Sequence, residues 1–270
     1  MPQTIFITGS STGLGRATAL LFARKGWNVI ATMRNPSKET ELASVAGISL
    51  VELDVTKPEQ IDAAARSALA MGPVDVVFNN AGYGLAGPFE SATDEQLVHE
   101  IDTNLLGVLR VTKAFIPSFR ERGEGMFIAT TSIGGLMTFP LNSVYHATKF
   151  GLEGWSESLA FELGKFGIRV KTVAPGAIKT DFVSRSLVMT SHPAYVAIVT
   201  KVMSVFMDPA RAAGHSTAEQ IAEVVWEAAT DGKDQVTYVA GADAKATYAQ
   251  RLAVGVEVFR KHVGQMFLGS

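Results

Sequence analysis

Tyr145 and Lys149, in the stretch Tyr-His-Ala-Thr-Lys, are the pair whose types and spacing best suit proton transfer. Residues four apart lie one turn from each other on one face of a helix. A free phenol titrates near pH ~10, and a neighbouring ammonium group favours the phenolate and lowers that pKa. Such a phenol can exchange a proton with a carbonyl or alcohol oxygen. A single Tyr-x-x-x-Lys is more often two exposed side chains on an amphipathic helix, so other residues must support this interpretation.

The pair opens a helix predicted over Tyr145–Phe166, which follows a strand predicted over Gly125–Thr131. Ser132 comes directly after that strand, where a hydroxyl can donate to a substrate oxygen or serve only as an ordinary strand-end residue. The helix must therefore return to the end of this strand for the three residues to meet.

The chain begins with a predicted strand, Thr4–Thr8, and a predicted helix, Arg16–Lys25, joined by a glycine turn. Glycines let the backbone turn tightly and approach a pyrophosphate that rests on a helix N-terminus. This context favours a dinucleotide site over a glycine turn without a ligand. The expected contact residues are Gly9, Ser11, Thr12, Gly13, Leu14 and Gly15.

Arg34 follows the second predicted strand, Asn28–Thr32. Many NAD sites carry an acidic residue near this position to hold the ribose 2′-hydroxyl, but here the position is taken by Met33. An arginine can pair with a 2′-phosphate through two parallel hydrogen bonds. We therefore expect NADP(H) to be preferred over NAD(H); a solvated arginine in a loop is the alternative.

Polar or glycine-containing segments follow the remaining strands as well. These strands are predicted over Ile48–Leu53, Val74–Phe78, Arg169–Ala174 and Val236–Val239, and the segments include Asp54, Asn79–Gly82 and Pro175–Thr180. Apolar strands that alternate with helices indicate a parallel sheet covered on both faces, and such sheets bind ligands at the carboxyl ends of their strands. We expect one α/β domain over residues 1–270: a Rossmann-like doubly wound parallel sheet of about seven strands with helices on both faces.

Composition excludes several classes of function. The 270 residues are 47% hydrophobic, with a net charge of −2 and a pI near 6.2, so no basic surface for nucleic acid is indicated. The chain has no cysteine, which excludes disulfides and thiolate catalysis, and its five histidines lack metal-ligand spacing. The first residues read as a strand rather than a signal peptide, and no apolar run is long enough to span a membrane. We expect a cytoplasmic protein without a metal site.

Together these motifs give the chain a close resemblance to the short-chain dehydrogenase/reductase family, in its single-domain branch. The marks are Thr8-Gly9-x-x-x-Gly13-x-Gly15, Asp54, Asn79-Asn80-Ala81-Gly82, Asn104 in the helical stretch Asp94–Phe119, Ser132, Tyr145-x-x-x-Lys149 and Pro175-Gly176-x-x-x-Thr180. They stand in the family's order and spacing over residues 4–180, with the strand at 236–239 in addition.

The resemblance implies a role for each of four residues. Tyr145 is the general acid in carbonyl reduction and the base in alcohol oxidation, and Lys149 lowers its pKa and binds the nicotinamide ribose. Ser132 donates to the substrate oxygen. Asn104 holds a water that links Lys149 to solvent.

Further cofactor contacts are implied by the same resemblance. Asp54 would bind the adenine amino group beside Val55, Asn80 to Gly82 would line the ribose, and Ile178 and Thr180 would hold the carboxamide. The implied cofactor-binding residues beyond the glycine turn and Arg34 are Asp54, Val55, Asn80, Ala81, Gly82, Tyr145, Lys149, Pro175, Gly176, Ile178 and Thr180.

Residues 181–216 form a long, apolar connection before a helix that begins at Thr217 with a Thr-x-x-Gln capping box. Pro193–Met207 can form a helix with one apolar side that includes Tyr195, Ile198, Val199, Val202 and Phe206. We interpret the connection as a lid over a lipophilic substrate. The alternative is that its apolar side packs on the core or at a subunit interface.

The last predicted helical stretch is Asp243–Phe267, and the pattern before it is similar to that of family members acting on steroids and retinoids. Such members pair through the helices that carry Asn104 and Tyr145, which implies a homodimer or homotetramer. We therefore expect an NADP(H)-dependent alcohol dehydrogenase or carbonyl reductase acting on a small lipophilic alcohol, ketone or aldehyde. The alternatives are a non-catalytic dinucleotide sensor or interaction protein, and an isomerase or dehydratase on the same scaffold. The intact Ser132, Tyr145, Lys149 and Asn104 argue against the sensor.

Overall fold

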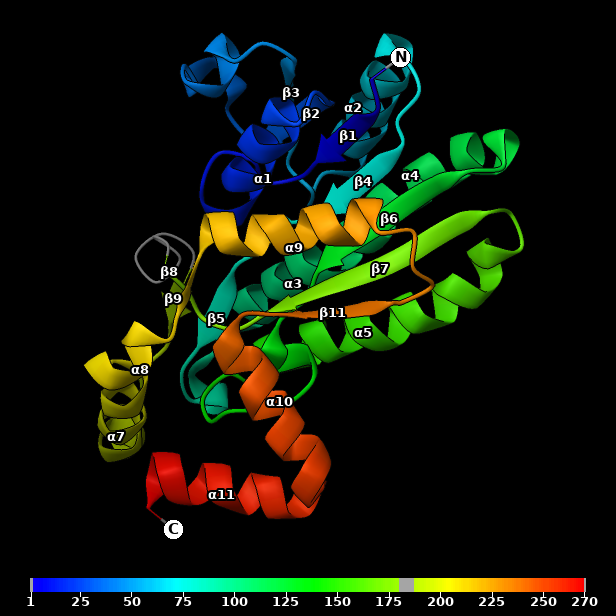
Figure 1. The fold of residues 1–270 in the computed structure, drawn as a ribbon. Helices are drawn as coiled ribbons and strands as arrows, with labels where there is room; N and C mark the ends of the chain where they lie inside the picture. Colours follow the sequence, from blue (N-terminus) through cyan, green and yellow to red (C-terminus); the bar gives the residue numbers. More distant parts are fainter. Residues whose placement is uncertain (1, 180–186, 270) are drawn as a thin grey trace.

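The structure, a computed structural model, describes residues 2–179 and 187–269. Its centre is a twisted seven-stranded sheet in the order β11-β7-β6-β4-β1-β2-β3, and every neighbouring pair is parallel. This confirms the predicted doubly wound sheet (Figure 1). The strands are β1 (Thr4–Ile7), β2 (Asn28–Met33), β3 (Ile48–Glu52), β4 (Val76–Asn79), β6 (Gly125–Thr130), β7 (Ile168–Pro175) and β11 (Thr237–Ala240).

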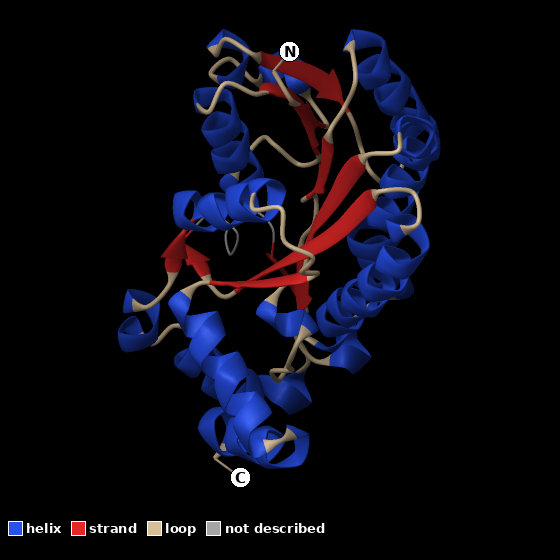
Figure 2. Ribbon diagram, turned by 45° about the vertical axis from the view of Figure 1, so that its right-hand side comes forward, coloured by secondary structure: helices blue, strands red, loops and turns tan. Residues whose placement is uncertain are grey.

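Helices cover both faces of the sheet, as Figure 2 shows. Helices α1 and α9 pack on one face, and α2, α4 and α5 pack on the other. Their bounds are α1 (Gly13–Arg24), α9 (Ala218–Thr230), α2 (Pro58–Met71), α4 (Gly107–Arg122) and α5 (Ser143–Gly164). The Thr217 capping box expected from the sequence is present at the start of α9.

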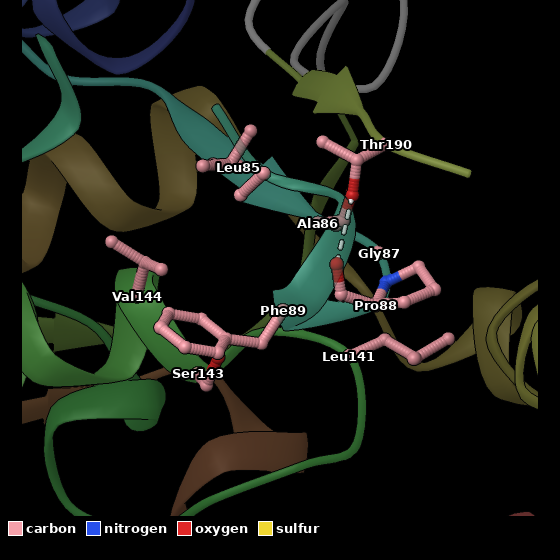
Figure 3. A pocket seen from close by; sticks show the side chains of 10 residues that line it. Leu85, Ala86, Gly87, Pro88, Phe89, Leu141, Ser143, Val144 and Thr190 are labelled. Carbon is pink, nitrogen blue, oxygen red and sulfur yellow. Dashed lines mark hydrogen bonds between the residues drawn. The ribbon is translucent and has the colours of Figure 1, made fainter. Parts of the chain in front are cut away.

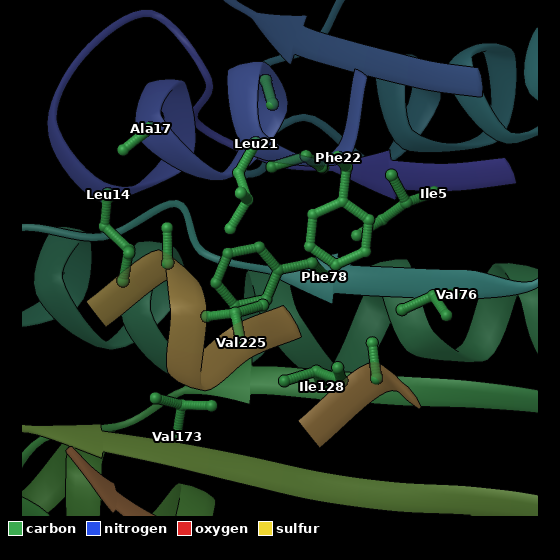
Figure 4. Packing of buried hydrophobic residues seen from close by; sticks show 14 of the residues in the cluster. Ile5, Leu14, Ala17, Leu21, Phe22, Val76, Phe78, Ile128, Val173 and Val225 are labelled. Carbon is green, nitrogen blue, oxygen red and sulfur yellow. The ribbon is translucent and has the colours of Figure 1, made fainter. Parts of the chain in front are cut away.

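The two-sided core follows from the strand sequences, because successive side chains of a strand point to opposite faces. Ile5 and Ile7 of β1 belong to the cluster under α1 and α9, whereas Phe6 between them belongs to the cluster under α2, α4 and α5. Figure 4 shows the first cluster, in which Phe22 of α1 and Val225 of α9 meet side chains of the sheet. An apolar run without alternation in polarity therefore predicts a strand buried on both faces.

Loops at the carboxyl ends of β1 and β4 lie next to each other. The chain passes from β1 to its neighbour β2 on one side, while β4 pairs on the other side. This is the switch point at which open α/β sheets bind ligands. The glycine turn follows β1 and the Asn79–Gly82 segment follows β4, so the fold brings these two motifs together.

The predicted helical stretch around Asn104 is continuous but not uniformly α-helical. Helix α3 (Asp94–Ile101) passes through a π-helical turn at Asp102–Leu106 into α4. A π turn widens the backbone spacing and commonly marks a functional position in a helix. Asn104 lies inside this turn.

Two short ladders lie outside the main sheet, and one of them joins the region after β7 to the segment after β4. Strand β9 (Leu187–Met189) pairs with β5 (Gly84–Ala86), and β10 (Ser216–Thr217) pairs with β8 (Ile178–Lys179). The helix expected over residues 193–207 is present as a 3₁₀ turn, Pro193–Tyr195, followed by α7 (Val196–Phe206). Other short elements are the 3₁₀ turns Pro36–Lys38, Leu42–Ser44, Phe89–Ser91 and Ile133–Gly135, and helix α8 (Pro209–Ala213).

The prediction of a single C-terminal helical stretch is wrong in the number of helices. It consists of two helices, α10 (Ala242–Val254) and α11 (Val256–Leu268), which meet at Gly255 with φ of 79°. Only glycine adopts such a conformation without a steric cost, so Gly255 turns the chain there. Figures 1 and 2 show α7, α10 and α11 gathered at the end of the molecule near the C-terminus. No helix of residues 2–179 and 187–269 is both long and apolar enough to cross a bilayer.

Candidate active site

The glycine turn approaches neighbouring backbone too closely to admit side chains. Gly9 has φ of +69°, and a Cβ there would lie 2.8 Å from Cα of Ala81. A Cβ on Gly15 would lie 2.3 Å from the carbonyl oxygen of Gly9 and 2.6 Å from Nδ2 of Asn80. These two glycines therefore let the turn after β1 pack directly against the loop after β4.

Asn80 fixes that contact with hydrogen bonds. Its Nδ2 donates to the carbonyl oxygens of Thr8 at 3.1 Å and Gly9 at 3.2 Å. The Thr8 hydroxyl accepts hydrogen bonds from the backbone N–H groups of Asn80 at 2.9 Å and Ala81 at 3.0 Å. Thr8, the first residue of the glycine motif, therefore holds the loop after β4 in place.

The remaining residues of the turn differ in what they offer a ligand. Ser11 and Thr12 are exposed, and Thr12 makes no capping hydrogen bond to α1. Leu14 is 6% exposed and belongs to the hydrophobic core, so only its backbone faces the turn. Gly13 begins α1 with φ of 55°. The first N–H groups of α1 thus form the kind of helix terminus that attracts a phosphate.

Arg34, Asp54 and Val55 lie past the ends of β2 and β3. The Arg34 side chain is exposed, and within the described part of the chain it forms no ion pair at 4.0 Å or less. Burial raises the pKa of Asp54, but hydrogen bonds from Thr56 and the charge of Arg34 outweigh burial and leave the pKa lowered. Val55 is 7% exposed and packs against Gly107 at the start of α4.

The loop after β7 is held by a residue that the motifs did not identify. Asp243, in the first turn of α10, accepts a hydrogen bond from the backbone N–H of Ala177 at 3.0 Å. A Cβ on Gly176 would lie 2.4 Å from both of its carboxylate oxygens. Pro175 is buried at the end of β7, and Ile178 is half-buried in β8. Thr180 lies outside the described residues.

Asn104 is fully buried and uses its amide as a backbone substitute. Its Oδ1 accepts from the N–H of Tyr83 at 3.0 Å, and its Nδ2 donates to the carbonyl oxygen of Tyr83 at 2.7 Å. A Cβ on Gly82 would lie 3.0 Å from Oδ1 of Asn104 and 3.8 Å from Nζ of Lys149. The side chain thus fixes the segment that separates it from Lys149.

Lys149 and Tyr145 stand together on α5, at the end of β6. Nζ of Lys149 donates to the carbonyl oxygen of Thr130, the last residue of β6, at 2.8 Å and lies 5.7 Å from the centre of the Tyr145 ring. Ser132 follows this strand, and its Oγ accepts from the N–H of Gly134 at 2.9 Å. The structure therefore brings the three predicted residues to the same strand end.

These contacts continue to the glycine turn. The Thr130 hydroxyl donates to Oδ1 of Asn80 at 3.2 Å, while Asn80 holds the carbonyl groups of Thr8 and Gly9. A chain of hydrogen bonds therefore runs from Lys149 through Thr130 and Asn80 to the turn after β1. One network positions the proton-transfer pair and the expected phosphate-binding turn.

The charge balance at Tyr145 differs from the expectation. Burial raises the pKa of Tyr145; the Ser132 hydroxyl opposes this shift and the carboxyl of Glu100 adds to it. Burial lowers the pKa of Lys149 to about 8, against the opposing charges of Glu100 and Glu153. The expected lowering of the tyrosine pKa by Lys149 is thus not the net result, because desolvation of the phenolate is the larger effect.

Glu100 is a second residue that the motifs did not reveal. It is fully buried on α3, one turn before Asn104, and burial raises its pKa to about 7. The available signal was the spacing, because Glu100 stands four residues before Asn104 and hence on the same helix face.

His146, next to Tyr145 in the sequence, has a structural role. Its Nε2 accepts from the N–H of Phe139 at 2.9 Å, so Nδ1 carries the proton and donates to the carbonyl oxygen of Gly134 at 2.7 Å. Burial lowers the pKa of His146. The neutral ring ties the loop after Ser132 to α5, and its centre lies 6.2 Å from the centre of the Tyr145 ring.

A small hollow lies beside the start of α5, between β5 and the segment that precedes α5 (Figure 3). Its floor is held by the N–H of Gly87, which donates to the carbonyl oxygen of Leu141 at 2.8 Å, and Leu141 has φ of 64°. The lining side chains are mostly apolar. They are Leu85, Ala86, Pro88, Phe89, Ala92, Leu141, Ser143, Val144 and Thr190, with Gly87 contributing backbone.

The apolar side of α7 is divided between two environments. Val202 is 1% exposed and packs with Met137, Phe259, Val263 and Phe267, whereas Ile198 is 39% exposed. Packing on the protein interior, the alternative given for this stretch, therefore holds for Val202 and not for Ile198. The part of the proposed lid at residues 181–186 lies outside the described residues.

The assembled groups fit a dinucleotide. Gly9 and Gly15 keep the space beside the α1 N-terminus free of side chains. The exposed Arg34 follows β2, and Asp54, which is hydrogen-bonded to Thr56, follows β3. Lys149 lies on the other side of the switch point. Such donors suit, in order, a pyrophosphate, a ribose phosphate with its base, and a second ribose.

Comparison with known proteins gives the same result. A family model described as short chain dehydrogenase matches residues 3–189. Retinol dehydrogenase 8 of Bos taurus is 35% identical over 216 residues, which cover 77% of this chain and 69% of that protein. The crystal structure of a short-chain dehydrogenase from Streptomyces avermitilis superposes with a TM-score of 0.86 at 32% identity, covering 98% of this chain and 95% of that one. A structure of ElxO with NADP bound gives 0.77 at 25% identity, covering 91% and 100%.

Proposed function

The chain belongs to the short-chain dehydrogenase/reductase family, and from this premise we propose that it is an NADP(H)-dependent oxidoreductase that interconverts an alcohol and its ketone or aldehyde. The observation that carries the proposal is the meeting of Ser132, Tyr145 and Lys149 at the end of β6, joined through Asn80 to the glycine turn. A dinucleotide sensor or interaction protein has no need of a buried lysine beside a half-buried phenol.

When bound, the nicotinamide supplies or accepts a hydride. The side chains of this protein handle the proton and the oxygen. In carbonyl reduction Tyr145 gives its phenol proton to the substrate oxygen, and in alcohol oxidation it takes that proton back. Ser132 donates a hydrogen bond to the same oxygen and stabilises the charge that develops there. Lys149 binds ribose hydroxyls, and Asn104 maintains the segment beside Lys149 through which water exchanges protons.

Arg34 supports NADP(H) as the cofactor, because an exposed guanidinium at this strand end can bind a 2′-phosphate, with Ser11 and Thr12 as additional hydroxyl donors. Arg34→Ala is expected to raise the Kd for NADPH more than tenfold while leaving the Kd for NADH nearly unchanged, as measured by fluorescence titration. Arg24→Ala, at the far end of α1, is the matched control. Equal weakening of both cofactors would refute the phosphate contact.

We propose a lipophilic substrate because apolar side chains gather at the start of α5, where Val144, the residue before Tyr145, lines a small hollow together with Leu85 and Pro88 (Figure 3). Strand β5, which carries Leu85, pairs with β9. The related retinol dehydrogenase 8 carries the name of a lipophilic alcohol. Residues 181–216 would then cover the substrate. A test is to compare kcat/KM for short and long aliphatic ketones in wild type and in Leu85→Ser; an equal loss for both would contradict apolar recognition.

The exposed apolar side chains of α3 and α5 support a homodimer or homotetramer. Phe161 is 82% exposed and Val98 is 66% exposed. Large apolar side chains in this number on a surface commonly mark an interface. Sedimentation measurements that find only monomer at micromolar concentration would contradict this part of the proposal.

The decisive assay follows loss of NADPH absorbance with a panel of ketones and aldehydes. Tyr145→Phe is expected to reduce kcat by a factor of about 10²–10⁴, the usual contribution of general acid–base catalysis. Tyr248→Phe removes a hydroxyl from the C-terminal cluster and is the matched control, with unchanged turnover expected. Full activity in Tyr145→Phe would refute the mechanism.

A further inference from the structure

Glu100 occupies an environment that is unusual for a carboxyl group. It is fully buried on α3, and in the part of the chain that the structure describes it forms no ion pair within 4.0 Å. Its Oε1 accepts from the N–H of Leu85 at 2.9 Å and from Nδ2 of Asn104 at 3.5 Å. Its Oε2 is buried without a hydrogen-bond partner among the described residues.

A structural role alone does not require a carboxyl here. The N–H of Leu85 needs one acceptor oxygen, which a glutamine would provide without the cost of burying an ionisable group. An unpartnered carboxyl oxygen in a closed interior lowers stability. The second oxygen and the charge of Glu100 therefore call for a separate explanation.

The groups that face Glu100 belong to the proposed active site. Its charge acts on Tyr83, from the segment before β5, and on Tyr145 and Lys149 of α5. On the other side of Lys149, Glu153 is the second carboxyl that the lysine senses. Negative charge on Glu100 raises the pKa of Lys149 and of Tyr145, so it favours the ammonium and the phenol.

We propose that Glu100 is a positioning residue of this site: its carboxyl holds Asn104 and the Leu85 segment in place, and its negative charge keeps Lys149 protonated and Tyr145 in the phenol form. The inference rests on the proposed function, since it assigns these charge states to carbonyl reduction. It acts through two other side chains and needs no contact with substrate.

The consequence is a site whose pH dependence is set in part by one buried carboxyl group. Burial raises the pKa of Glu100 to about 7, so the carboxyl changes its charge near neutrality. Ionised Glu100 favours the proton-donating form of Tyr145, which is the form that reduction uses. Protonated Glu100 removes that bias and makes the phenolate, which oxidation uses, easier to form.

The first test needs no turnover. In protein labelled with ¹³C at lysine Cε, the Lys149 signal, assigned by its absence in Lys149→Arg, reports the protonation of Nζ as a function of pH. Glu100→Gln keeps the acceptor for Leu85 and removes the charge, so the Lys149 titration should move to lower pH by about one unit. By Coulomb's law, two unit charges roughly 10 Å apart at an effective dielectric near 20 interact with about this strength. Glu95→Gln, on the exposed side of α3, should leave it unchanged.

The second test is the pH profile of carbonyl reduction. In Glu100→Gln the loss of activity at high pH should begin about one pH unit lower than in wild type. A uniform loss at every pH with an unshifted profile, or an unshifted Lys149 titration, would show a purely structural role and overturn the inference. If wild type reduces no carbonyl while the lysine titration shifts as expected, the proposed function fails and the charge coupling stands.

Discussion

Asn80→Asp tests the network that joins the glycine turn to the proton-transfer pair. The substitution keeps the shape of the side chain and replaces its donor by a carboxylate oxygen. In the wild type, Nδ2 of Asn80 donates to the carbonyl oxygens of Thr8 and Gly9, at 3.1 and 3.2 Å. In the variant two attractive contacts become two oxygen–oxygen repulsions, while the Thr130 hydroxyl can still donate to Oδ1.

The structure sets the size of the expected effect. Two lost hydrogen bonds cost about 1 kcal/mol each, and leaving each carbonyl against a carboxylate adds about 1 kcal/mol, for a total of about 4 kcal/mol. Calorimetry of the protein without cofactor should show Tm lowered by about 10 °C. The carboxylate also repels a bound pyrophosphate, so the Kd for NADPH should rise more than tenfold.

The control is Asn28→Asp, which makes the same chemical change at the exposed first residue of β2. It should leave both Tm and the Kd for NADPH close to wild type. Wild-type Tm and wild-type NADPH affinity in Asn80→Asp would refute the view that this side chain fixes the turn. A lower Tm with an unchanged Kd for NADPH in Asn80→Asp would show that this side chain stabilises the fold without positioning the binding site, and would refute the shared network.

Three further predictions concern other parts of the molecule. Lys171→Met should lower the free energy of unfolding by about 3 kcal/mol in denaturant titrations, because Lys171 is only 1% exposed, pairs with Asp231 at 2.9 Å and donates to the Tyr238 hydroxyl. The control Lys245→Met, at the surface, should leave the free energy of unfolding unchanged. Equal effects of the two substitutions would contradict the argument. Burial lowers the pKa of His146 and keeps the ring neutral, so its contribution to stability is present above about pH 6.5 and is lost as pH falls below that value. His146→Gln should therefore flatten the dependence of Tm on pH in thermal unfolding. An unchanged dependence of Tm on pH would contradict this role of His146. Phe161→Asp should convert the proposed oligomer to monomer in sedimentation without loss of fold, and an oligomer that is unchanged by the substitution would exclude this surface as the interface.

Most of the fold could be predicted from local patterns. Strands buried on both faces appear as unbroken apolar runs, such as residues 76–78 of β4, and the glycines of the first turn stand where a strand passes into a helix. The site residues that belong to strand ends were found because the carboxyl ends of parallel strands share one edge. Ser132 is such a residue, whereas Tyr145 and Lys149 stand on a helix and follow from their spacing and from the family resemblance.

What the sequence did not reveal depends on contacts between distant segments. Asp243 reaches the Gly176 loop from 66 residues away, and Glu100 reaches Leu85 across 15 residues. Neither contact has a local periodicity. The break at Gly255 was missed because a glycine inside a helical pattern is tolerated at a cost and need not end the helix. The pKa of Tyr145 was misjudged because desolvation depends on burial, which spacing does not give.

The hydrogen bonds around Thr130 explain why the chemistry stands at this strand end. Its carbonyl oxygen accepts from Lys149 and its hydroxyl donates to Asn80, so one residue of β6 orients both halves of the proposed site. Its position is set by the ladder with β7, in which Thr130 lies opposite Val173. A central strand of the sheet therefore fixes the lysine relative to the glycine turn, and we expect substrate selection to depend on the segments around β5 and β9. Substitutions in those segments should change which carbonyl is accepted without moving the proton-transfer pair.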